Sequence, residues 1–109
     1  MLDDRQVQFQ SYATGEWSVR QDASAASHIV AKAFAMARAT NRAYGEVQAY
    51  LQREIDRVSS SDGCPPQSWS IYIEGDAQPG LRLDYGDTFV YTATAHYYGV
   101  AQSHGTRGG

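Results

Sequence analysis

The fold is decided by residues 22–59, which read DASAASHIVAKAFAMARATNRAYGEVQAYLQREIDRVS. Asp22 is a good N-cap residue, and the alanine-rich run that follows it has high helix propensity. Two groups of apolar residues recur at the i, i+3, i+4 spacing of one helix face: Ala26, Ile29, Val30, Ala33, Phe34 and Ala37, then Val47, Tyr50, Leu51, Ile55 and Val58. This period predicts helix through most of the stretch.

The segment between the two apolar groups allows two interpretations. Asn41 and Gly45 both tolerate the left-handed conformation that often ends a helix, which favours two helices packed as a hairpin. The two groups are nearly in phase, however, so a single helix from 22 to 59 is the alternative. Such a helix would be about 57 Å long, roughly twice the diameter of a compact domain of this size, and would imply an oligomer.

The segments on either side of the helical stretch alternate between apolar and polar residues, as half-buried strands do. Residues 6–20 predict a β-hairpin with its turn at Thr14-Gly15. After a loop that contains Cys64 and two prolines, three strands are expected near 68–74, 81–85 and 88–100, with turns at Pro79-Gly80 and Gly86-Asp87.

These elements predict an α+β fold in the order β-β-α-α-β-β-β. One antiparallel sheet of about five strands would carry a helical hairpin on one face. Residues 1–100 would form a single domain and residues 101–109 a flexible C-terminal tail. The helices are expected to cover the following side chains: Val7, Phe9, Trp17, Val19, Trp69, Ile71, Ile73, Leu81 and Leu83.

The composition of the chain indicates which kinds of partner and which cellular compartment to expect. A net charge of −3 and a pI near 5.4 disfavour direct nucleic-acid binding, which depends on clustered Lys and Arg. The sequence contains no run of about 18 apolar residues, so no membrane span is expected. Residues 1–5 lack the features of a signal peptide. The single cysteine, Cys64, cannot form an internal disulfide, which is typical of a cytoplasmic protein.

The sequence contains no recognisable catalytic signature. A phosphate-binding loop with a following Lys-Ser or Lys-Thr and a Gly-x-Ser-x-Gly motif are both absent. His28, His96 and His104 lack the spacing of a zinc site. The triple Ser70, His96 and Asp84 can be composed only by combining distant positions. We therefore expect no enzymatic activity, no cofactor and no metal.

The feature that stands out is aromatic. The chain has eight tyrosines, and several would lie on the sheet face turned away from the helices. The residues assigned to that face are Gln6, Gln8, Gln10, Tyr12, Ser68, Ser70, Tyr72, Arg82, Thr92, Thr94, His96 and Tyr98. Exposed sheet faces usually carry many charges, so this composition favours a contact surface. The alternative is that Tyr and Thr are simply good strand formers.

The favoured function is that of a non-enzymatic binding protein that acts on a protein partner through this face, such as a small inhibitor of a host protein encoded by a phage or mobile element. The residues expected to bind are Tyr12, Tyr72, Arg82, His96, Tyr98 and Arg107. One alternative is an oligomer that binds or sequesters a small nucleotide-like ligand by aromatic stacking and arginine contacts. A second alternative is a structural subunit of a phage particle.

Overall fold

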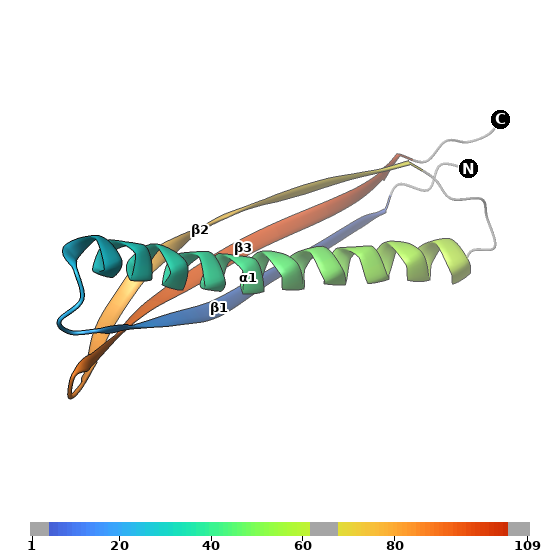
Figure 1. The fold of residues 1–109 in the computed structure, drawn as a ribbon. Coiled ribbons are helices and arrows are strands. Elements are labelled where there is room, and N and C mark those ends of the chain that lie inside the picture. Colours follow the sequence, from blue (N-terminus) through green and yellow to red (C-terminus); the bar gives the residue numbers. More distant parts are fainter. Residues whose placement is uncertain (1–4, 62–67, 105–109) are drawn as a thin grey trace.

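The computed structural model describes residues 5–61 and 68–104 of the 109-residue chain. The elements are β1 (Gln6–Arg20), α1 (Ala25–Ser61), β2 (Ser68–Tyr85) and β3 (Thr88–His104), and α1 lies along one face of the sheet (Figure 1). The three strands are antiparallel in the order β1-β3-β2. The predicted α+β class with one antiparallel sheet is confirmed, but the described chain has three strands instead of about five and one helix instead of two.

The helix α1 is a single unbroken element of 37 residues, so the preferred helical hairpin is wrong and the alternative is right. Its N-cap lies two residues later than expected. The hydroxyl of Ser24, not the carboxylate of Asp22, accepts the hydrogen bond from the Ser27 amide at 3.1 Å. The objection from length fails because the molecule is a rod of 68 × 18 × 16 Å, and its strands of 15 to 18 residues are long enough to support the helix.

Two of the three predicted turns are not turns. Residues 6–20 form one continuous strand, because Gly15 is extended and pairs with Ala93 while α1 passes close above it. Pro79-Gly80 lies inside β2, where the register shifts from Pro79 opposite Ala93 to Arg82 opposite Tyr91. This inserts one extra residue in β2, as a β-bulge does. The turn at Gly86-Asp87 is confirmed, with Gly86 at a φ of 64°.

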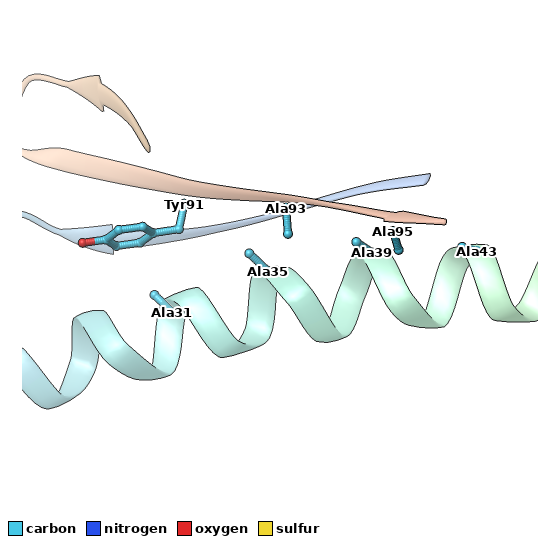
Figure 2. Close-up of a cluster of buried hydrophobic side chains, with 7 residues drawn as sticks. All are labelled: Ala31, Ala35, Ala39, Ala43, Tyr91, Ala93 and Ala95. Carbon is cyan, nitrogen blue, oxygen red and sulfur yellow. The ribbon is translucent and has the colours of Figure 1, made fainter. Parts of the chain in front are cut away.

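The buried side of α1 has a strict four-residue period: Ala31, Ala35, Ala39, Ala43, Val47, Leu51 and Ile55. Because a helix has 3.6 residues per turn, each step of four drifts by about 40°, and the buried line winds around the helix as the twisted sheet requires. The alanine half brings α1 close to Ala93 and Ala95 of β3 (Figure 2). The predicted second apolar group is therefore confirmed at Val47, Leu51, Ile55 and Val58.

The predicted first apolar group of the helix is wrong as a core face. All six of its members, from Ala26 to Ala37, are exposed, and the alanines beside them are buried instead. Alanine satisfies both patterns in the sequence, but only a small side chain permits the close approach of α1 to the sheet. The larger residues of this half are therefore turned outward.

The central strand β3 continues to His104, four residues beyond the expected end of the strand. Ala101 and Ser103 are buried, and Ser103 exchanges hydrogen bonds with Arg5, whose amide donates to the Ser103 hydroxyl and whose carbonyl accepts from the Ser103 amide, each at 2.9 Å. Cys64 and Arg107 lie outside the described residues. Within the part of the chain that is described, no helix is long and apolar enough to cross a membrane.

Candidate functional site

The sheet face turned away from α1 is not covered by any described element, and we call it the open face. Cross-strand partners point to the same side of a sheet, so the pairing register defines its members. These are the even-numbered residues of β1 and β3, then Ser68, Ser70, Tyr72, Glu74, Asp76 and Gln78 of β2 and, after the bulge, Leu81, Leu83 and Tyr85. The prediction of a polar face opposite the helix is thus correct for eleven of its twelve members, all except Arg82.

The middle of the open face holds most of the predicted binding residues. Tyr12 is 70% exposed, and its ring stacks on His96 with centroids 4.1 Å apart. His96 Nε2 lies 2.9 Å from Oε1 of Gln10. Tyr98 lies in the next row of the sheet, directly opposite Gln10, and Tyr72 is 61% exposed on the neighbouring strand β2. Four of the six predicted residues therefore share one continuous surface.

The side chains on this face hydrogen-bond mainly to one another. The Tyr72 hydroxyl donates to Glu74 at 3.2 Å, and this bond, together with the carboxylate charge, raises the pKa of Tyr72. Gln6 donates to Gln102 at 3.1 Å, and Gln8 donates to Gln6 at 2.6 Å. These neutral contacts hold long polar side chains flat along the strands and leave their outer surfaces available to a partner.

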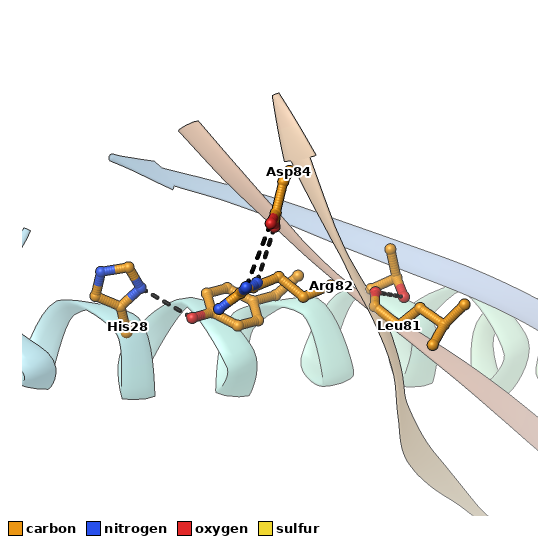
Figure 3. Close-up of polar contacts among 6 residues, drawn as sticks. His28, Leu81, Arg82 and Asp84 are labelled. Atoms are coloured by element: carbon orange, nitrogen blue, oxygen red, sulfur yellow. Dashed lines mark hydrogen bonds and ion pairs between the residues drawn. The ribbon is translucent and has the colours of Figure 1, made fainter. Parts of the chain in front are cut away.

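Arg82 does not belong to the open face, and its predicted place there is wrong. The bulge after Pro79 turns Arg82 to the helix side, where its guanidinium lies 3.7 Å from the centroid of the Phe89 ring. Arg82 also donates to Asp84 at 2.9 Å (Figure 3). Asp84 and this hydrogen bond raise the pKa of Arg82. Arg82 is therefore engaged within the chain, while Arg107 lies outside the described residues.

The same bulge corrects a second prediction. Leu81 and Leu83 were expected beneath the helix, but they lie on the open face and are 79% and 40% exposed. Tyr85 follows at 61%, and Val90 is the cross-strand partner of Leu83. The Thr92 hydroxyl donates to the carbonyl of Leu81 at 2.6 Å, which stabilises the bulge. We call Leu81, Leu83, Tyr85 and Val90 the leucine end of the open face.

A groove of about 970 Å³ runs between β1 and α1. It is a candidate site for the alternative function, the binding of a small nucleotide-like ligand. Its charged residues are Arg42, Glu46 and Arg53. Arg42 donates to the Thr14 carbonyl at 2.7 Å, Ser11 donates to Glu46, and Arg53 lies 5.9 Å from the centroid of the Tyr50 ring. Arg20, at the end of β1, pairs with Asp22 at 3.2 Å and Asp87 at 3.8 Å. The groove gives this alternative no specific support.

The catalytic triple that can be composed from the sequence is not assembled. Ser70 lies opposite Gln102, whereas His96 lies opposite Asp76, six residues further along the sheet. Asp84 lies on the other side of the sheet near the β2–β3 turn, and Ser70 contacts His104 instead. Within residues 5–61 and 68–104, no group of three His, Cys, Asp or Glu side chains could hold a metal ion.

Comparison with known proteins finds no matching family model, no matching curated protein and no matching solved structure.

The leucine end is the part of the surface that the sequence did not reveal. The dipeptide Pro79-Gly80 marks an interruption of the strand pattern, and a bulge with one extra residue would have placed Leu81 and Leu83 correctly. A turn at the same place leaves the phase of the next strand undetermined, so the sequence alone does not place the two leucines on the open face.

Proposed function

We propose that this chain is a non-enzymatic binding protein whose contact surface is the open face and whose partner is a protein. One observation carries the proposal: within residues 5–61 and 68–104, no layer covers this face of three long strands, and the face carries large exposed side chains. Tyr12, Tyr72 and Leu81 are each more than half exposed. Exposed apolar surface on this scale is unusual in a monomer and typical of an interaction site.

The chemistry of the open face supports a protein partner. Its charged members are few, namely Glu16, Arg20, Glu74 and Asp76. Charged residues are depleted and tyrosine is enriched at the centres of protein interfaces, because tyrosine adds large rigid area and one hydroxyl at low entropic cost. The three acidic groups against one basic group suit a partner with a mildly basic surface, as expected of a small inhibitor.

A structural or self-assembling subunit is the second candidate. It is favoured by a second exposed apolar surface, on the outer side of α1, where Ile29 is 66% and Phe34 is 45% exposed. An inhibitor of a single target needs one contact surface, whereas a subunit of an open-ended assembly needs at least two different ones.

The test is affinity capture from cells of the source organism with two baits. The first carries Tyr12→Ala with Tyr72→Ala on the open face. The second, a matched control, carries Gln48→Ala with Gln52→Ala at exposed positions of α1. Both should melt as the wild type does, because all four side chains are exposed. The proposal expects a stoichiometric protein partner that the control retains and the tyrosine variant loses; equal capture by both would refute it.

A further inference from the structure

The outer side of α1 carries an exposed apolar stripe, which touches β1 at its margin, where the rings of Phe34 and Trp17 meet edge-on with centroids 4.7 Å apart. Its members are Ala26, Ile29, Val30, Ala33, Phe34 and Ala37, and we call them the outer stripe. Ala33 lies two residues from both Ala31 and Ala35, which is about 200° around the helix axis, so Ile29, Ala33 and Ala37 are opposite the buried alanines, whereas Val30 and Phe34 lie to one side. The first half of α1 is thus apolar on two opposite sides, although only the inner one is buried in the described chain.

The outer stripe and the leucine end lie at the same end of the rod, on opposite faces. His28, in the first turns of α1, is hydrogen-bonded to the Tyr91 hydroxyl at 2.9 Å and lies 5.7 Å from the Phe89 ring. Phe89 and Tyr91 are the neighbours of Val90 in β3. The side chain of Val90 lies on the open face, as part of the leucine end, whereas those of Phe89 and Tyr91 lie on the helix side. The described chain therefore presents two apolar surfaces back to back.

We infer that the open face binds the outer side of α1 in a second copy of this chain, so that copies stack in the same orientation with sheet and helix layers alternating. The inference rests on the proposed function, because it names the partner of the open face. It repeats the packing already present within one chain, a helix laid along a three-stranded sheet.

The dimensions of the two surfaces match. The outer stripe spans eleven helical steps, or about 17 Å, and the leucine end spans four strand steps along β2, or about 14 Å. Beyond these apolar ends, the rest of α1 in one copy would lie along the rest of the open face in the other copy. Three strands of this length present roughly 700–800 Å² of flat surface, which is the area each partner contributes to a standard stable interface.

Charge favours this arrangement over a pairing of two helices. Between residues 25 and 45, α1 carries three basic side chains, Lys32, Arg38 and Arg42, and no acidic one. The open face carries three acidic groups and one basic group. Lys32 and Arg38 lie over the Tyr91 and Trp17 rings, and Arg42 lies 4.0 Å from Glu16 of its own chain, so the basic groups flank the outer stripe. Their net positive charge would repel a second outer stripe and attract the net negative open face.

This interface is heterologous, because it joins different surfaces of the two copies, and each added copy leaves one helix side and one open face free. Analytical ultracentrifugation with two variants tests this property. Ile29→Glu damages only the outer stripe and Leu81→Glu damages only the leucine end, both at positions more than half exposed. Gln48→Glu is the control for an added charge on exposed helix surface.

The wild type and Gln48→Glu should associate with rising concentration, and each damaging variant should lose at least about tenfold in association constant. An equimolar mixture of Ile29→Glu and Leu81→Glu should form a species of two copies and nothing larger, because the mixture contains only one intact pairing. Raising the salt concentration from about 0.05 to about 0.5 M should weaken association of the wild type.

Two results would overturn the inference. One is a wild type that stays monomeric at about 1 mM. The other is a Leu81→Glu variant that associates as the wild type does, which would indicate helix-to-helix pairing. Circular dichroism of each variant confirms that it is folded. Loss of a captured partner by the tyrosine variant, in a chain that remains monomeric, would leave the proposed function standing and remove only this inference.

Discussion

Gly15 of β1 lies directly beneath the backbone of Ala39 in α1. A Cβ atom added to Gly15 would come within 3.1 Å of the Ala39 Cα and closer still to the main-chain atoms Ala39 N and Ala35 O. Main-chain atoms in the middle of a helix cannot rotate aside as a side chain can. This contact therefore sets how near α1 approaches the sheet over the alanine half of the core.

Replacement of Gly15 by alanine should destabilise the protein by about 3 kcal/mol or more, because α1 must lift away from Ala93 and its neighbours. Gly45→Ala is the matched control, since a Cβ there meets nothing within 4 Å and Gly45 lies inside the helix. It should stabilise by roughly 0.5–1 kcal/mol. Urea denaturation measures both; similar losses in the two variants would contradict the close approach.

Substitutions of two leucines, Leu51 in α1 and Leu81 after the bulge in β2, should have very different effects on stability. Leu51 is fully buried, and Leu51→Ala should cost about 3 kcal/mol in the free energy of unfolding. Leu81 is 79% exposed, and Leu81→Ala should change that free energy by less than about 0.5 kcal/mol. The pair is compared in one urea series. A large loss in the free energy of unfolding for Leu81→Ala would show that Leu81 is buried and would contradict its place in the leucine end.

The pKa of Tyr72 should fall towards its ordinary value when Glu74 is replaced by Gln, because the charged hydrogen-bond acceptor is removed. A raised folded-state pKa means that the contribution to stability is present at neutral pH and is lost as the pH rises through that pKa. Ring signals of labelled tyrosine, assigned with Tyr72→Phe, follow the titration by NMR. An unchanged titration would show that the Tyr72–Glu74 contact is absent in solution.

Tyr91→Phe should cost about 1 kcal/mol, the usual net value of one hydrogen bond. Tyr91 is only 9% exposed, and its hydroxyl bonds His28 at 2.9 Å, which joins the start of α1 to β3. The ring itself remains to pack against the alanines of the first half of the core. Thermal unfolding of the variant measures the loss, and Tyr85→Phe, at a position that is 61% exposed, is the control.

The sequence was sufficient for the class of fold and for most of the open face, because alternation with a period of two depends only on local order. The side chains of Tyr12, Tyr72, His96 and Tyr98 were assigned to one face in this way, and the register places them together. The prediction failed where the phase depended on an interruption. At Pro79-Gly80 a turn and a bulge have the same local chemistry, and only pairing with β3 distinguishes them.

The helix was misjudged for a related reason. Gly45 and Asn41 permit a break but do not require one, and a helix of about 57 Å is too long only for a compact domain, whereas this molecule extends over 68 Å. The sequence also does not identify the buried side of the first half of α1. Its alanines fit two different helix faces, and the large apolar residues Ile29 and Phe34 favour the face that is in fact exposed. Which alanines are buried depends on the close contact at Gly15, and that contact is between residues far apart in the sequence.

Because β3 is the central strand and the last to be synthesised, the sheet cannot form until nearly the whole chain has been made. The partner strand β1 is synthesised before residues 21–87, and Gln6 finally pairs with Gln102, 96 positions later. Until then β1 has no described strand beside it, because β2 pairs only with β3. Contacts of such long sequence separation slow folding, so β1 and the early half of α1 remain exposed to chaperones or to other nascent chains until β3 emerges.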